Sequence, residues 1–217
     1  MCSNSPRPLT SLHSATHMKT KSLKITSPVG IAVWPRLNEP DREYVESGEF
    51  KVDLLLDPAD EGVEEFIDAL QKYADDAFAD ICAENGKSQG LKRSAFPWKD
   101  EIDRDSQEAT GRVIFRAKMK HEVKPKHSEA FTQRPKLFDA SGHGMTAVVG
   151  AGSRVRVSVE LVPYYTPQIG AGVTARLKAV QVIELVAFSP GGSARDHGFD
   201  AIDGGYCAIE ERDGPER

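Results

Sequence analysis

The chain has 217 residues, a net charge of −5, 39% hydrophobic residues and 28% charged ones. This composition is typical of a soluble globular protein, and the length suits one large domain or two small ones. No apolar run approaches the length of a membrane span and the N-terminus lacks the apolar core of a signal peptide, so we expect a cytoplasmic protein. Its three cysteines are odd in number and widely spaced, which predicts reduced thiols.

Composition divides the chain into three segments. Residues 1–17 are rich in Ser, Thr and Pro and show no periodicity, which predicts a disordered leader, and a start at Met18 stays an open alternative. Residues 18–188 contain the strand and helix patterns and are expected to form one domain. Residues 189–217 are acidic and glycine-rich, which predicts a flexible tail.

Two strands and a long helix are predicted in the first half of the domain. The first strand covers residues 19–34, with an interruption near Ser27, and is stopped by Trp34-Pro35. The second covers 49–56. Asp57 is the expected N-cap of a helix that ends at Asn85-Gly86 and turns a strongly acidic face to solvent.

Shorter elements follow the helix. Residues 86–110 are interpreted as a polar connection, and residues 111–121 as a strand with alternating apolar and basic positions. Short strands are expected at 137–139 and 145–149. The predicted inward residues of the long strand are Val113, Phe115, Ala117 and Met119.

Residues 153–186 predict a β-hairpin. Residues 153–161 alternate strictly between apolar and polar side chains, the pattern of a strand with one buried face. The connection over 163–172 is rich in proline and glycine, so both strands are expected to stop there, with Tyr164 and Tyr165 near the tip. The predicted inward residues of the second strand are Val173, Ala175, Leu177 and Ala179.

The order of these elements predicts the fold class. One helix stands among several short strands separated by turns, and no internal repeat is present. A sheet with a single buried face must close on itself or be covered. We therefore expect a mainly β protein, an OB-fold-like antiparallel barrel with one long helix packed across it.

Basic residues gather in the predicted strands and their loops. Residues 39–84 carry 16 acidic and three basic residues, whereas residues 111–136 carry eight basic and two acidic ones. A solvated surface is the ordinary interpretation of any one lysine, but basic residues repeated on three strands, with Glu160 as the one acid expected opposite them, favour a groove for an anionic partner. Such a groove would hold phosphates, and flat side chains beside it would stack on bases. The candidate DNA-binding residues are Arg112, Arg116, Lys118, Lys120, Lys124, Lys126, Phe131, Arg134, Arg154, Arg156, Tyr164, Tyr165, Arg176 and Lys178.

The aromatic candidates are of unequal weight. Tyr164 and Tyr165 are predicted base platforms, although at least one is expected to pack into the end of the barrel. Phe131 lies in the basic loop and is the better stacking candidate than Trp34 or Trp98, for which a core role weighs at least as much.

Several segments together resemble a known family. They are FPWKD followed by TGRVIFRAKMK, then GSRVRVSVELVPYY, GVTARLKAVQVIEL and HGFDAIDGGY, and they span about Met18 to Tyr206. They resemble bacteriophage single-stranded DNA-binding proteins of the short-tailed-phage replication type. The resemblance implies an OB-fold core, sequence-tolerant binding of single-stranded DNA and an acidic C-terminal tail that contacts replication partners. The tail departs from the family pattern because it is only modestly acidic and ends in Glu-Arg, and residues 1–17 have no counterpart.

We therefore expect a non-enzymatic protein of phage-type DNA replication or recombination, acting in the host cytoplasm. It would protect single-stranded DNA and promote its annealing, and its acidic tail would contact replication proteins. No cofactor or metal is expected, because the spacing of His121, His127 and His143 matches no standard metal site. Two alternatives stay open: a virion β-barrel subunit, and an RNA-binding OB module. A homodimer is also an open alternative, and no membrane partner is expected.

Overall fold

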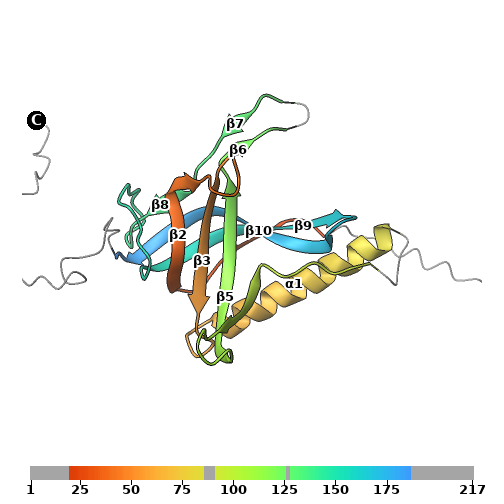
Figure 1. The fold of residues 1–217 in the computed structure, drawn as a ribbon, viewed down its shortest axis with the longest axis horizontal. Coiled ribbons are helices and arrows are strands. Elements are labelled where there is room, and N and C mark those ends of the chain that lie inside the picture. The colour runs from red at the N-terminus through yellow and green to blue at the C-terminus, as the bar shows by residue number, and fades with distance from the viewer. Residues whose placement is uncertain (1–19, 86–90, 126–127, 187–217) are drawn as a thin grey trace, which may run out of the picture. The chain divides into compact units, whose positions relative to one another are not determined.

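Figure 1 shows a curled β-sheet with one long helix beside it. The structure, a computed structural model, describes residues 20–85, 91–125 and 128–186. The predicted leader over 1–17 and the predicted tail over 189–217 lie outside the described residues, as do Cys2 and Cys207. Cys82 is a free thiol, as predicted, and is partly buried. Within the described residues, no helix combines the length and hydropathy that crossing a bilayer requires.

Five strands of the described chain form a closed barrel. Their order is β2 (Gly30–Asp41), β3 (Glu49–Leu56), β5 (Ala109–Lys120), β10 (Gly170–Glu184) and β9 (Arg154–Thr166), and β9 pairs back with β2. Neighbours run antiparallel except β5 and β10, which are parallel. This is the five-stranded Greek-key barrel of an OB-fold, so the predicted fold class is confirmed.

Short strands extend the barrel at its edges. β1 (Leu23–Thr26) lies along β9, β4 (Trp98–Ile102) along β5, and β8 (Lys136–Phe138) along β10. β6 (Glu122–Val123) and β7 (Phe131–Thr132) form a separate hairpin beyond the end of β5 (Figure 1). The segment predicted as a polar connection therefore contains a strand, β4.

The strand predicted at 145–149 is absent from the described structure. The side chain of Asn38 bonds this segment instead: its Nδ2 donates to the carbonyl of Ala147 at 3.0 Å, and its Oδ1 accepts the N–H of Val149 at 3.1 Å. A side chain thus satisfies backbone groups that the prediction had assigned to a strand ladder.

The first predicted strand is broken and longer than expected. The break between β1 and β2 confirms the interruption near Ser27, but β2 continues through Trp34-Pro35 to Asp41. Trp34 has φ 48°, and the register with β3 shifts between Val33 and Arg36. A bulge of this kind leaves residues outside the ladder, so the missing N–H of proline is tolerated there.

Helix α1 (Val63–Glu84) begins later than predicted. Asp57 is not its N-cap, because the Asp57 carboxylate accepts the N–H of Ala59 at 3.0 Å and thereby forms a turn. Gly62 occupies the N-cap position with φ 76°. The predicted end is confirmed, since Asn85 is the C-cap.

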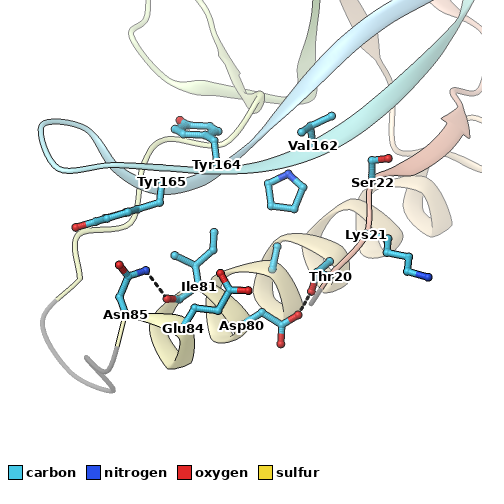
Figure 2. Close-up of a pocket in the computed structure, with 12 residues that line it drawn as sticks. Thr20, Lys21, Ser22, Asp80, Ile81, Glu84, Asn85, Val162, Tyr164 and Tyr165 are labelled. Atoms are coloured by element: carbon cyan, nitrogen blue, oxygen red, sulfur yellow. Dashed lines mark hydrogen bonds between the residues drawn. The ribbon is translucent and has the colours of Figure 1, made fainter. Parts of the chain in front are cut away.

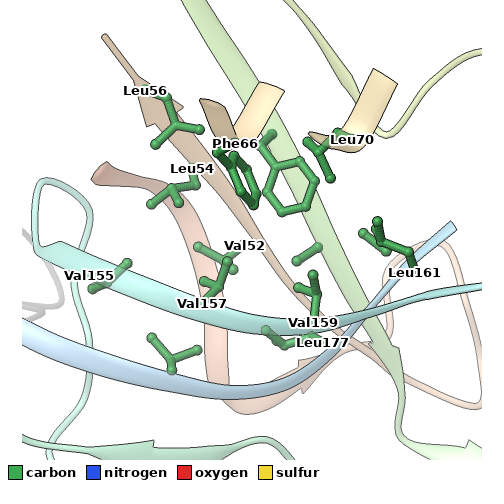
Figure 3. Close-up of a cluster of buried hydrophobic side chains, with 14 of the residues drawn as sticks. Val52, Leu54, Leu56, Phe66, Leu70, Val155, Val157, Val159, Leu161 and Leu177 are labelled. Atoms are coloured by element: carbon green, nitrogen blue, oxygen red, sulfur yellow. The ribbon is translucent and has the colours of Figure 1, made fainter. Parts of the chain in front are cut away.

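The core lies between the barrel and one face of α1, and it contains Phe115, Ala117 and Met119 of β5 and the apolar residues of the alternating segment of β9. Val113 is buried as predicted but lies outside this cluster. Figure 3 shows Phe66 and Leu70 of the helix above side chains from β3, β9 and β10. Phe66 meets Phe115 edge to face, with ring centroids 5.3 Å apart. In β10 a bulge after Leu177 changes the alternation, so Val180 is buried where Ala179 was predicted.

The β9–β10 hairpin is longer than predicted, and its strands do not stop at the proline-rich segment. β9 runs through both tyrosines to Thr166, and Tyr164 and Tyr165 pair with Gly172 and Ala171. β1 pairs with β9 only as far as Leu161, so Pro163 lies on an open edge, where proline is tolerated. The tyrosines are therefore strand residues.

Candidate nucleic-acid interface

A row of four basic residues crosses the outer face of the barrel. Arg36 pairs with Lys51, Lys51 with Lys118, and Lys118 with Arg176, so the row passes from β2 through β3 and β5 to β10. Cross-strand partners point to the same face of a sheet. Arg36, Lys118 and Arg176 are exposed and Lys51 is partly buried, whereas residues beside them in the strands, such as Leu37, Val52 and Ala117, are buried. We call these four residues the basic row.

The basic row is only partly neutralised. Asp41 accepts from Lys51 at 2.6 Å, and Glu49 lies 3.1 Å from the ammonium of Lys118. The hydrogen bond from Lys51 lowers the pKa of the Asp41 carboxyl. Arg36 and Arg176 form no close ion pair among the residues that the structure describes, but each has a carboxylate nearby. The cross-strand partner of Arg176 on β9 is Glu160, and the positive charges of Arg36 and Arg176 help to lower the pKa values of Asp41 and Glu160. Because neutralisation is incomplete, the row leaves positive potential on this face. Like charges directly opposite each other also destabilise a sheet.

A groove of about 430 Å³ adjoins the β10 end of the basic row. Its wall includes the β6–β7 hairpin, which is tied to the barrel through Gln133: the Gln133 amide donates to the carbonyl of Lys120 at 2.9 Å. Phe131 on this hairpin is 49% exposed. The predicted site residues that line the groove are Lys118, Lys120, Phe131, Arg176 and Lys178.

The two adjacent tyrosines point to opposite faces of β9 (Figure 2), as successive strand residues do. Both border a cavity of about 800 Å³ beside the end of α1, and Tyr165 lies on the helix side. Tyr164 lies over Gly172, because a Cβ built there would be 3.2 Å from the tyrosine Cζ. Gly172 is two residues from Thr174, which lines the groove, so Tyr164 shares a face with the groove.

Acidic residues meet more of the predicted cations than the sequence indicated. The expectation that Glu160 was the one acid opposite them is wrong. Arg112 and Arg116, for example, meet acids on β4 and β3, and these contacts follow from strand pairing, which the sequence does not specify. The ion pairs are Arg112–Glu101 at 2.7 Å, Arg116–Asp53 at 2.5 Å, Lys124–Glu122 at 3.2 Å, Arg154–Glu184 at 2.8 Å and Lys178–Glu160 at 2.7 Å. The hydrogen bond to Asp53 raises the pKa of Arg116, and the bond from Lys178 lowers that of Glu160.

The remaining predicted residues are dispersed. Arg154 and Arg156 lie on β9, which β10 separates from β5. Arg156 donates through Nε to the carbonyl of Ser27 at 3.2 Å. Arg134 is exposed beyond the β6–β7 hairpin, and Lys126 lies outside the described residues. The structure therefore does not bring all the candidates into one groove.

Sequence reasoning missed two members of the basic row, Arg36 and Lys51. The alternation of 49–56 indicates that Lys51 faces outward, but the partners of Lys51 follow from strand register, which the sequence does not specify. Arg36 lies beyond the predicted end of its strand. The tryptophans differ: Trp98 stacks on Phe96 at 4.4 Å between ring centroids and packs against the core, whereas Trp34 is 69% exposed.

The site offers charge and flat rings. Within the described ranges, no three His, Cys, Asp or Glu side chains are grouped so that they could hold a metal ion. Cations in a groove with aromatic rings beside it can hold phosphates and stack on bases. Fold and site together define an OB-fold protein with a cationic, aromatic-flanked outer face.

The family model described as "Single-stranded DNA-binding protein, Bacteriophage T7" matches residues 31–185. The chain therefore belongs to this family, and the predicted resemblance is confirmed.

Individual relatives agree with this assignment. The single-stranded DNA-binding protein of Enterobacteria phage T3 is 29% identical over 174 residues, which are 76% of this chain and 74% of the relative. The crystal structure of gp2.5, a single-stranded DNA-binding protein encoded by bacteriophage T7, superposes with a TM-score of 0.65 at 25% identity and covers 87% of this chain and 100% of that one. The single-stranded DNA-binding protein of bacteriophage Enc34, solved in complex with ssDNA, has a TM-score of 0.52 at 14% identity over 78% of this chain and 89% of that one, and shares the fold.

Proposed function

We propose that this chain binds single-stranded DNA with little dependence on base sequence, in the replication or recombination of a bacteriophage. Its family and the names of its relatives support the ligand. The observation that carries the proposal for the site is the basic row, in which three consecutive cross-strand pairs join like charges. Such pairs cost stability in the free protein, and bound phosphates would add negative charge beside cations that Asp41, Glu49 and Glu160 neutralise only in part.

The basic and the aromatic side chains have different proposed roles in binding DNA. Arg36, Lys51, Lys118 and Arg176 attract the phosphate backbone, which carries no sequence information. Phe131 lines the groove at the β10 end of the row and Tyr164 lies over Gly172 on the same face, and each offers a ring on which a base can stack. Every base has such a face, so binding of this kind tolerates any sequence.

The proposed role is binding without catalysis. A protein that coats exposed strands would protect them, remove hairpins and bring complementary strands together, in the host cytoplasm where phage DNA is copied. The acidic segment 189–217 is the proposed contact for replication proteins, which its excess of acidic over basic residues supports.

A binding titration tests the proposal. The ligand is a fluorescently labelled oligothymidylate of roughly 16 nucleotides, the upper range for one OB-fold, and the readout is anisotropy over a series of salt concentrations. We expect affinity to fall with a log–log slope of about −0.7 per phosphate neutralised. Absence of binding, or a flat salt dependence, contradicts the proposal. Competition by RNA of the same length distinguishes the RNA-binding alternative.

A paired variant locates the site. Replacing Lys118 and Lys120 together by alanine should weaken binding to all sequences and make the salt slope shallower. Arg154→Gln is a control outside the groove, because Arg154 lies on the other side of β10 from β5 and pairs with Glu184. An equal loss in both variants would count against the groove.

A further inference from the structure

Trp34 occupies a position that neither its backbone nor its packing favours. It has φ 48°, in the left-handed region, where a bulky residue is a genuine outlier. It also precedes Pro35, and a residue before proline is normally held in the extended region. Its side chain is 69% exposed, so the free protein gains little from burying it. Glycine would satisfy this backbone without strain.

The bulge places Trp34 beside the basic row. Val33 pairs with Asp53 and Arg36 pairs with Lys51, so Trp34 falls between these two outward-facing pairs of β2 and β3. Ala32 and Leu37, on either side of the bulge, are buried in the barrel, whereas Trp34 is exposed. An indole is therefore held outside the barrel two residues before Arg36, the β2 end of the row.

Aromatic side chains therefore lie at both ends of the basic row. Phe131 lines the groove at the β10 end, where Lys118 meets Arg176. The row spans three strand-to-strand intervals, about 14 Å at ordinary sheet spacing. A strand that follows the phosphate-binding side chains from β10 to β2 arrives at the indole. Strained conformations persist where the surrounding structure imposes them, and such outliers cluster at ligand sites.

We propose that Trp34 is a base-stacking platform at the β2 end of the basic row, held out for this purpose by the bulge at Trp34-Pro35. The inference rests on the proposed binding of single-stranded DNA and extends the binding path to β2. The alternative role, a structural one, would require Trp34 to stabilise the barrel.

Intrinsic fluorescence can isolate this residue. In the Trp98→Phe variant the remaining tryptophan is Trp34, and phenylalanine keeps a ring against Phe96. Oligothymidylate should quench its emission, with saturation at the concentration at which anisotropy of the labelled oligonucleotide saturates. The reciprocal variant, Trp34→Phe, reports Trp98 and should show little quenching. If the emission of Trp34 is unchanged while anisotropy shows binding, the inference is wrong.

Affinity for two ligands separates stacking from geometry. Trp34→Ala should weaken binding of oligothymidylate by about 5- to 150-fold, the range for loss of one stacked base. Trp34→Phe should restore most of the loss. Binding of an abasic oligodeoxynucleotide of equal length should be unaffected, because it has no base to stack. Equal weakening for both ligands would show that Trp34 merely positions Arg36, and would overturn the inference.

Glycine at position 34 should change stability and DNA affinity in different directions. Trp34→Gly relieves the left-handed conformation, so its melting temperature should equal or exceed that of the parent while its oligothymidylate affinity falls. A lowered melting temperature would assign Trp34 to barrel stability and overturn the inference. The proposed function fails separately, when the parent protein itself does not bind the oligonucleotide.

Discussion

Lys118 on β5 and Arg176 on β10 are direct partners in the parallel pairing that closes the barrel. Both side chains are exposed, and the guanidinium of Arg176 has no ion pair among the residues that the structure describes. Two cations are thus held side by side at the seam where the β-barrel joins. The closure of the fold and the charge of the site therefore depend on the same two strands.

Removing one member of this pair should weaken DNA binding without unfolding the protein. We expect Arg176→Gln to lower affinity for oligonucleotides of every sequence and to reduce the salt slope by about 0.7, one phosphate contact on a single strand. Anisotropy titrations at several salt concentrations measure both quantities. Arg154→Gln, with the same change of charge on β9, should alter neither by as much.

The two adjacent tyrosines should behave differently. Tyr164 shares a face with the groove, so Tyr164→Ala should cost roughly 1–3 kcal/mol of binding while Tyr164→Phe restores most of it. Tyr165 lies toward α1, so Tyr165→Ala should leave affinity nearly unchanged. Melting temperature measured alongside affinity separates a binding defect from a folding one. Equal binding defects in the two alanine variants would contradict the placement of these rings.

Gly172 should control Tyr164 without touching DNA. A Cβ at this position would be 2.8 Å from the Cβ of Ser94, which must shift, and 3.1 Å from the tyrosine hydroxyl oxygen, so Gly172→Ala also pushes the ring outward slightly. We expect weaker oligonucleotide binding, and a double-mutant cycle with Tyr164→Ala should show strong non-additivity. Additive losses would mean that Gly172 acts on affinity by another route.

Stability at high pH should depend on Tyr73, a buried residue of α1. Its hydroxyl lies 2.8 Å from the carbonyl oxygen of Lys21 and 3.0 Å from that of Leu161 and shares its single proton between them, which joins the helix to the segment before β1 and to β9. Burial raises the pKa of Tyr73 from 10.0 to about 12. Its unionised form is therefore favoured in the folded state.

The sign of this dependence follows from linkage. The contribution is fully present below the unfolded pKa of 10.0 and is lost as the pH rises toward about 12. Tyr73→Phe should lower the free energy of unfolding near neutral pH by about 1 kcal/mol, the usual net value of a hydrogen bond. It should also make the decline above pH 10.0 shallower. Urea unfolding of both proteins across this range measures the difference, and parallel curves would contradict the assignment.

Local pattern was sufficient for much of the fold. The alternation of 153–161 predicted the buried face of β9, and the spacing of apolar residues before Asn85 predicted α1 and its end. These features were predictable because they depend on residues within a few positions of one another. Boundaries were less predictable. A proline would end a central strand, but Pro35 lies at a bulge and Pro163 on an open edge, where proline is tolerated, and distant segments of the chain create both surroundings.

The site shows the same division more sharply. The sequence by itself determined that outward positions on β5 and β10 are basic and that aromatic residues lie near them, since side-chain direction alternates along any strand. Tertiary structure alone decided that Arg36, Lys51, Lys118 and Arg176 form one row while Arg154 and Arg156 lie apart from it. It also decided which cations meet acids on β3 and β4. The physical reason is register: a shift of one residue between paired strands would turn every side chain to the other face, and what fixes that register is the packing of the whole barrel core.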